Sequence, residues 1–251
     1  MKQVIRIGSM INKKQDKEYR NFNSTADEWW LENGKFSILH KINPLRIRYI
    51  LRQIFRGKKK SKGRTPLKGL KIIDVGCGGG LVCEPLAKLG ADMLGVDFVK
   101  KNIDVAKKHA IIEGLKIKYI SSDIKNLKLK GKYDVIIILE VIEHITDWNK
   151  IILGLDKHLN SKGLLIVSSI NRNIISRLMA IIVAENILNW IPKGTHKYQK
   201  LVKPEEIKKL LESINYKVVD ISGMIYNPII NEWALSKNKT KINYFCTAIK
   251  N

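Results

Sequence analysis

Four glycines stand within five positions between an apolar run and a helix-like segment in IIDVGCGGGLVCEPL. Because glycine lacks a Cβ atom, a loop rich in it lets a ligand touch the backbone. Asp97 closes the next apolar run, 21 positions after the first of these glycines. An acid in that position commonly binds the hydroxyls of a ribose. The pattern predicts a nucleoside-binding site made by Asp97 and the loop of Gly76, Gly78, Gly79 and Gly80.

Asp74 indicates which nucleoside is bound. The string GCGGG satisfies only the first part of the dinucleotide spacing GxGxxG, and Asp74 lies two residues before the loop. A carboxylate there repels a phosphate but suits a cationic amino-acid group. Adenosine with a cationic amino-acid tail is S-adenosylmethionine, so the residues predict a site for it built from Asp74, Gly76, Gly78 and Asp97. A glycine turn without a ligand is the alternative.

A second cluster, EVIEHITD, holds two acids and a histidine. If this segment is helical, Glu140, Glu143 and His144 share one face. Two carboxylates and one imidazole suit Mg²⁺ or Mn²⁺ better than zinc, since the HExxH pair is absent. Such a cation would lower the pKa of a bound phenol. Alternatively the acids only line the cofactor pocket, and His144 is the general base. Glu140 and His144 are the candidate catalytic residues.

Apolar strand-like runs alternate with helical runs over most of the chain. This order predicts an α/β fold of the Rossmann-like kind, with a mostly parallel seven-stranded sheet covered by helices on both faces. We expect strands at 70–75, 91–96, 117–121, 133–139, 163–170, 216–222 and 242–250, and helices at 81–89, 99–113, 147–158 and 204–213.

Two further helices are expected before the first strand, at 16–31 and at 42–55, with Pro44 at the start of the second. We therefore divide the chain into N-terminal helices with a basic linker (1–66) and a core (67–251), the core carrying an apolar insertion at 171–203.

The chain of 251 residues is 45% hydrophobic and carries a formal charge of +23. This charge suits nucleic acid or anionic lipid as a partner. The lysines are spread along the whole chain, however, and a bias in genome composition produces the same pattern. Three cysteines without a CxxC pair predict neither a zinc site nor a disulfide framework, and favour a reducing cytosol. We expect no signal peptide and no membrane-spanning helix.

The segment 174–191 is apolar but holds Glu185 and Asn186 near its middle. It is too short to span a bilayer. Arg172, Arg177 and Lys193 flank its apolar run of 15 residues at 178–192, and Trp190 lies near one end, which is typical of a helix lying on an anionic membrane surface. A core or lid helix is the alternative.

The sequence resembles the class I S-adenosylmethionine-dependent methyltransferases, and within them the ubiquinone-biosynthesis O-methyltransferases. The similarity covers most of the chain beyond the first fifteen or so residues. Departures are the Lys-rich linker at 58–64 and GTHKYQKLVKP, where we expect an acid after His196. The matching stretches are FNSTADEWWLENGKFSILHKINPLRIRYI, IIDVGCGGGLVCEPLAKLGADMLGVD, LEVIEHITD, SSINRNIISRLMAIIVAENILNWIPKGTH and GMIYNPIINEW.

The resemblance implies methyl transfer from S-adenosylmethionine to a phenolic hydroxyl of polyprenyl catechol and demethylubiquinol intermediates. It implies cofactor contacts at Arg46, Gly76, Asp97 and Leu139, and a divalent cation at Glu140, Glu143 and His144. It also implies a cytoplasmic enzyme, peripherally associated with the inner membrane through its anionic surface. Its partners would be the polyprenyl substrate and other enzymes of ubiquinone biosynthesis, with no nucleic acid.

Two other classes of function were weighed. A methyltransferase for another small molecule, for RNA or for protein fits the same cofactor site, but a nucleic-acid enzyme should add a basic, aromatic-rich module, and the sequence shows none. A non-catalytic binding module predicts a damaged glycine loop or acid pair, and here both are intact.

Overall fold

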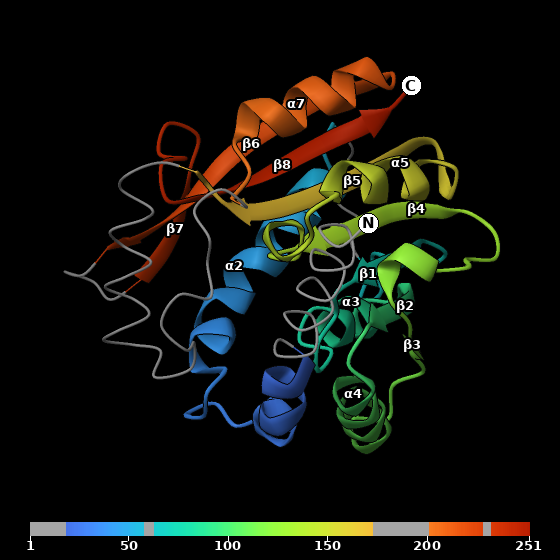
Figure 1. Cartoon of the computed structure of the whole chain (residues 1–251). Coiled ribbons are helices and arrows are strands. Elements are labelled where there is room, and N and C mark those ends of the chain that lie inside the picture. Colours follow the sequence, from blue (N-terminus) through green and yellow to red (C-terminus); the bar gives the residue numbers. More distant parts are fainter. Residues whose placement is uncertain (1–18, 58–62, 173–200, 228–231) are drawn as a thin grey trace, which may run out of the picture.

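The computed structural model of the chain describes residues 19–57, 63–172, 201–227 and 232–251. These residues form one mixed sheet of eight strands, in the order β3-β2-β1-β4-β5-β8-β6-β7 (Figure 1). The first five strands of that order are parallel, and β8 runs antiparallel between β5 and β6. The strands are β1 (Lys71–Val75), β2 (Asp92–Asp97), β3 (Lys118–Ser121), β4 (Tyr133–Leu139), β5 (Leu159–Ile170), β6 (Tyr216–Asn227), β7 (Glu232–Ser236) and β8 (Asn243–Lys250).

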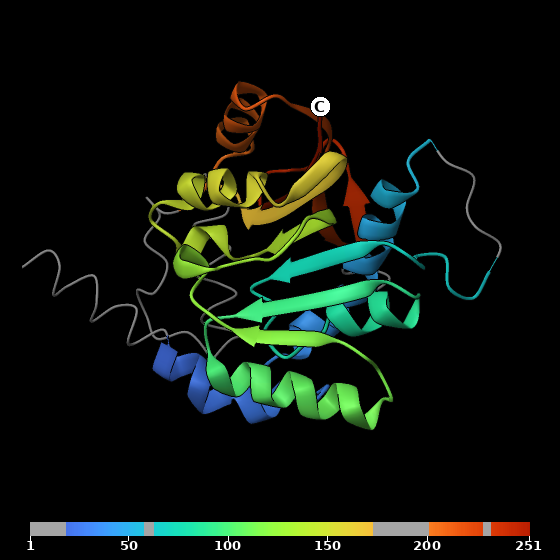
Figure 2. The same cartoon turned by 90° about the vertical axis from the view of Figure 1, so that its right-hand side faces the viewer.

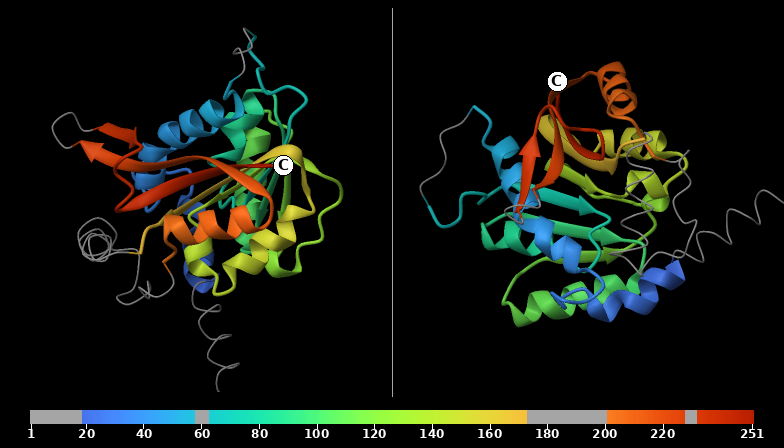
Figure 3. Two further views of the ribbon diagram at one scale, coloured as in Figure 1. Left: turned by 90° about the horizontal axis from the view of Figure 1, so that it is seen from above. Right: turned by 90° about the vertical axis from the view of Figure 1, so that its left-hand side faces the viewer.

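Helices cover both faces of the sheet, as Figures 2 and 3 show. One face packs against α2 (Ser37–Ile54), α3 (Cys83–Lys88) and α4 (Lys100–Ile112), and the other against α5 (Trp148–Asp156) and α7 (Pro204–Ser213). Central strands β1 and β4 read KIIDV and YDVIIIL because both of their faces are buried. The carboxyl ends of these parallel neighbours therefore meet at one edge, where such folds bind ligands.

The predicted α/β fold is confirmed, and each of the seven expected strands is present. The eighth, β7, was not predicted. It is a five-residue strand, EWALS, without a buried residue, and it pairs only with β6. A short edge strand of this kind carries little hydrophobic pattern from which to predict it.

The N-terminal helices differ from the prediction. Helix α2 begins at Ser37, so Pro44 lies inside it and not at its start. Proline there cannot donate a hydrogen bond to the carbonyl four residues earlier, but the first turn closes through Leu39 N and His40 N, which donate to Phe36 O. The helix expected at 16–31 is helical over 19–25 and continues as a 3₁₀ turn, η1 (Ala26–Glu28).

The apolar segment 174–191 lies outside the described residues. Within the described ranges, no helix combines the length and the apolar character needed to cross a membrane. The division of the chain near residue 66 stays a prediction. Tyr49 and Ile50 of α2 are fully buried in the same core as Ile72 and Phe245 of the sheet.

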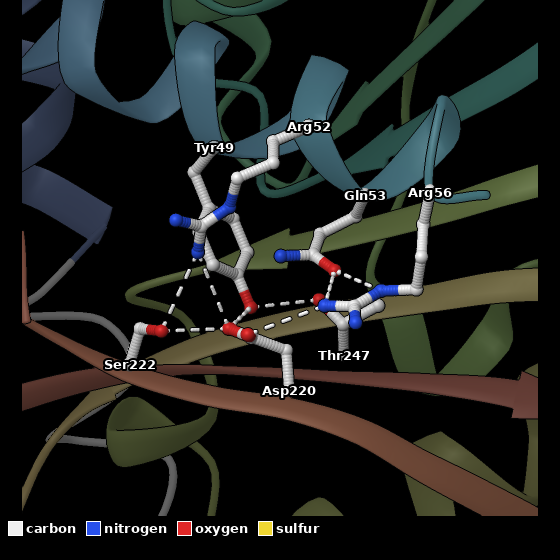
Figure 4. A network of polar contacts seen from close by, with 7 residues as sticks. All are labelled: Tyr49, Arg52, Gln53, Arg56, Asp220, Ser222 and Thr247. Carbon is white, nitrogen blue, oxygen red and sulfur yellow. Dashed lines mark hydrogen bonds and ion pairs between the residues drawn. The ribbon is translucent and has the colours of Figure 1, made fainter. Parts of the chain in front are cut away.

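A buried acid fastens α2 to the antiparallel side of the sheet (Figure 4). Asp220 of β6 accepts a hydrogen bond from Tyr49 Oη at 3.1 Å and forms ion pairs with Arg56 at 3.2 Å and Arg52 at 3.5 Å. The Tyr49 hydroxyl also lies 2.8 Å from Thr247 Oγ1 of β8. These contacts hold one helix against two strands more than 160 positions away.

Replacing Asp220 with Ala should destabilise the fold, because it leaves the buried Tyr49 hydroxyl and two arginines short of an acceptor. Hydrogen bonds to charged groups predict a loss of about 2 kcal/mol in the free energy of unfolding, measured by urea denaturation. Arg52→Ala is the matched control: that side chain is 45% exposed, and its pair should contribute less than about 1 kcal/mol. Equal losses in both variants would contradict the assignment.

Candidate active site

The glycine loop follows β1 and is bound to β2 at its base. Gly76 N and Cys77 N both donate to Val96 O, at 2.7 and 3.0 Å. Gly76, Gly78 and Gly80 have φ values of 81°, 52° and 91°, a region that other residues rarely adopt. The loop therefore needs glycine for its path, independently of any ligand.

Protein side chains occupy much of the room that these glycines leave. A β-carbon on Gly76 would overlap Val141, one on Gly78 or Gly79 would overlap the Trp29 ring, and one on Gly80 would overlap the Tyr119 hydroxyl. From the sequence alone, this space was expected to be filled by a ligand. The structure corrects that interpretation, because part of the space admits aromatic side chains that shape the loop.

Asp97 is the acceptor around which the loop is arranged. Its carboxylate is buried and accepts from Gly78 N at 3.0 Å, Val99 N at 2.8 Å and Asn102 Nδ2 at 3.2 Å. Burial raises the pKa of Asp97, while these three donors oppose the rise. A carboxylate accepts about four hydrogen bonds, so Asp97 keeps capacity for one further donor, such as a ribose hydroxyl.

Arg46 of α2 lies buried among three acids. It forms an ion pair with Glu140, and the carboxylates of Asp74 and Glu143 lie close enough to raise its pKa. Burial outweighs them and lowers the pKa of Arg46 to about 10. Within the described part of the chain, Arg46 Nε has no hydrogen-bond partner. An unpaired, buried guanidinium nitrogen fits a ligand carboxylate.

Asp74 lies fully inside the protein beneath the loop and accepts from Cys83 Sγ at 3.5 Å. Burial raises the pKa of Asp74 to about 7, although the hydrogen bond from Cys83 and the charge of Arg46 both oppose the rise. A carboxyl group with this pKa changes its charge near neutral pH. A cationic group bound beside it would favour the ionised form.

The acid–histidine cluster does not adopt the helix that was expected. Strand β4 ends at Leu139, Glu140 has a φ of 52°, and Ile142–His144 forms a single 3₁₀ turn, η3. Glu140 turns toward Arg46 and accepts from Ser168 Oγ at 2.9 Å. Glu143 is buried and accepts from Ser169 Oγ at 3.1 Å. The prediction of one shared helical face is therefore wrong.

His144 stands at the end of this turn, with the Phe22 ring edge-on to its imidazole at 6.5 Å between centroids. Across the ranges that the structure describes, no group of three or more His, Cys, Asp or Glu side chains is arranged to hold a metal ion. Glu140 forms an ion pair with Arg46, and Glu143 accepts a hydrogen bond from Ser169. As they stand, the residues do not fit a divalent cation.

The predicted cofactor residues do come together. Gly78 bonds Asp97, Asp74 interacts with both Asp97 and Arg46, and Leu139 directly precedes the glutamate that pairs with Arg46. Sequence reasoning missed Trp29 and Asn102. Trp29 Nε1 donates to Asn102 Oδ1 at 2.9 Å and so turns the amide nitrogen of Asn102 toward Asp97. No spacing rule connects residues 73 positions apart, and the double tryptophan was the only visible signal.

Residues 39–221 match the family described as a methyltransferase domain. The chain is similar to the ubiquinone biosynthesis O-methyltransferase of Pelagibacter ubique (strain HTCC1062), with 42% identity over 96% of this chain and 100% of that protein. It is 42% identical to the same-named protein of Rickettsia prowazekii (strain Madrid E), over 94% of this chain and 90% of that protein.

Among solved structures, the chain is similar to the magnesium protoporphyrin IX methyltransferase of Synechocystis PCC 6803 with bound S-adenosylhomocysteine. That match has a TM-score of 0.65 and 20% identity, and it covers 94% of this chain and 100% of the other. A SAM-dependent methyltransferase from Thermotoga maritima gives a TM-score of 0.66 at 13% identity, over 93% and 100% of the two chains. At these identities the likeness establishes the fold alone.

The raised pKa of Asp74 predicts a specific pH dependence of stability without cofactor. A carboxyl whose folded pKa is near 7 and whose unfolded pKa is about 3.9 contributes most below pH 4, and this contribution is lost as pH rises through 7. Asp74→Asn cannot titrate. The free energy of unfolding of the variant, minus that of the wild type, should therefore grow between about pH 4 and pH 7. A difference that stays constant between pH 4 and pH 7 would show that the pKa of Asp74 is not raised in the folded protein.

Proposed function

The chain belongs to the family of ubiquinone biosynthesis O-methyltransferases, and from that premise we propose that it methylates a phenolic hydroxyl of polyprenyl catechol and demethylubiquinol intermediates, with S-adenosylmethionine as methyl donor. Non-catalytic binding is disfavoured, since the glycine loop, Asp74 and Asp97 are all present and lie together.

One observation carries the proposal: among the described residues, buried Arg46 has no hydrogen-bond partner for its Nε, and it lies near Asp74, next to the loop that Asp97 holds. This donor set matches the three polar parts of the cofactor. Arg46 would take the carboxylate, Asp74 the ammonium group and Asp97 a ribose hydroxyl. Gly76 and Gly78 would give the loop the backbone path that borders the cofactor, and Leu139 would pack near the adenine.

When bound, S-adenosylmethionine supplies a methyl group on a sulfonium, whose transfer forms a carbon–oxygen bond and leaves neutral S-adenosylhomocysteine. The residues of the chain must orient the phenol and remove its proton. A phenol has a pKa of about 10 and a neutral imidazole is a suitable base, so we assign the proton to His144. Glu140 is the second proposed catalytic residue. It becomes available if the cofactor carboxylate replaces it on Arg46.

A methyl-transfer assay with labelled S-adenosylmethionine and a short-chain demethylubiquinol analogue tests this function directly. The wild type should methylate the analogue, and Asp97→Ala should raise the KM for the cofactor by about tenfold or more, because a bond to a charged acceptor is lost. Asp104→Ala is the control. It removes an equivalent carboxylate that is 52% exposed on α4 and pairs with Lys100. No product with the wild-type enzyme, or equal KM values in all three proteins, would refute the proposal.

The divalent cation at Glu140, Glu143 and His144 stays a prediction and no step above depends on it. A cation there would have to displace Arg46 from Glu140 and Ser169 from Glu143. The prediction requires that chelation abolish methyl transfer and that Mg²⁺ or Mn²⁺ restore it. If activity survives complete chelation, the cation is excluded. In that case we compare the activity of His144→Ala with that of the wild type at several pH values. A difference in activity that grows with decreasing pH supports His144 as the base.

We further propose that the enzyme lies on an anionic membrane surface at the cytoplasmic side of the inner membrane. The support is the apolar segment 174–191 with its basic flanks, together with a polyprenyl substrate too insoluble to arrive through water. Sedimentation with anionic liposomes tests this placement, and protein that stays in the supernatant contradicts it.

A further inference from the structure

A small hydrophobic cluster joins the N-terminal segment to the glycine loop. Its buried members are Ala26, Trp29, Phe36 and Leu81, and Val105 of α4 packs against them. The Trp29 and Phe36 rings stack with 3.8 Å between centroids. In Figure 2 the N-terminal segment, drawn in dark blue, lies alongside α4. The segment therefore rests against both the loop and the helix that follows β2.

Trp30, the next residue, contacts the loop backbone directly. Its Nε1 donates to Gly79 O at 3.0 Å, and its ring stacks on the imidazole of His109 with 3.5 Å between centroids and an interplanar angle of 1°. His109 belongs to α4. One side chain thus joins the middle of the glycine loop to a helix that contributes no loop residue.

His109 in turn is held by an acid that leads back to the loop. His109 Nδ1 donates to Glu84 Oε1 at 2.8 Å, and Glu84 N donates to Gly80 O at 3.1 Å. The contacts form a closed circuit that begins at Gly79 O, passes through Trp30, His109 and Glu84, and returns to Gly80 O. Each step in it is a hydrogen bond or a stacked pair.

The contact with His109 favours the ionised form of the Glu84 side chain. The side chain is buried, and burial raises the pKa of Glu84, while the hydrogen bond and charge of His109 lower it most. In the described part of the chain, Glu84 Oε2 has no hydrogen-bond partner. His109 is thus the main partner that favours the ionised form of the buried Glu84 side chain. In return, the Glu84 carboxylate fixes the plane of the imidazole ring against which Trp30 stacks.

We propose that Trp30, His109 and Glu84 are positioning residues that hold the glycine loop in its cofactor-binding shape without touching the reacting atoms. This inference rests on the proposed function, because it takes the loop to be the cofactor site. Loss of any of the three should weaken cofactor binding and leave the methyl-transfer step nearly unchanged once the cofactor is saturating.

The test compares His109→Ala with His109→Gln, whose planar amide can still donate to Glu84. Calorimetric titration with S-adenosylmethionine should give a Kd about tenfold higher for His109→Ala, and within about threefold of the wild type for His109→Gln. At saturating cofactor, kcat and the KM for the phenolic analogue should stay within about twofold of the wild type. A general loss of structure would not produce this separation.

Lys88→Ala is the matched control. Lys88 at the end of α3 pairs with Glu113, the residue that follows α4, at 2.7 Å, and that pair is exposed. Its Kd should not change. If His109→Ala fails to fold, Trp30→Phe keeps an aromatic ring but loses the bond to Gly79 O and part of the stacked surface, and it should raise the Kd by about threefold. Folded variants that bind the cofactor like the wild type, or a Lys88→Ala effect of the same size, overturn the inference. A wild type that binds no cofactor refutes the proposed function instead.

Discussion

The buried carboxylate of Asp97 is the constraint on which the arrangement of the site depends. It accepts hydrogen bonds from Gly78 N in the glycine loop, from Val99 N beyond β2 and from Asn102 in α4. Two segments, the glycine loop and the start of α4, are thereby fixed to one group at the carboxyl edge of the sheet. A buried charge is tolerated only when its acceptors are satisfied, so the loop cannot move far from β2 without a large cost. The same carboxylate is left with room for a ligand donor.

Several acidic side chains lie near this part of the site. Arg46 forms an ion pair with Glu140, and Asp74 and Glu143 lie near Arg46. Burial pushes the pKa values of Asp74 and Glu143 upward, so both acids gain from a cationic ligand. Arg46 itself is placed by α2, which is anchored one turn further along through Tyr49 to Asp220 and Thr247. The position of Arg46 in the proposed cofactor site thus depends on contacts at the antiparallel side of the sheet.

The sequence was sufficient to predict the features that depend on short, local patterns of residues. The alternating strands and helices, the glycine loop, Asp74 and Asp97 were all predicted, since spacing and apolar runs report directly on strand ends and turns. It was insufficient where distant segments meet. Trp29 meets Asn102 across 73 positions, and Tyr49 meets Asp220 across 171. EVIEH has helical spacing, yet Glu140 adopts a left-handed φ because its side chain is turned to Arg46 and Ser168. Tertiary contacts override local propensity there.

The central claim is that the loop from Gly76 to Gly80 and the segment from Asp97 to Asn102 form the cofactor site. Hydrogen–deuterium exchange, with and without S-adenosylhomocysteine, tests it most directly, because the method reports on backbone amides and needs neither substrate nor turnover. We expect the ligand to slow exchange at the amides of both segments and to leave α7 and the β6–β8 pair unchanged. Protection confined to other parts of the chain, with neither segment affected, would contradict the assignment.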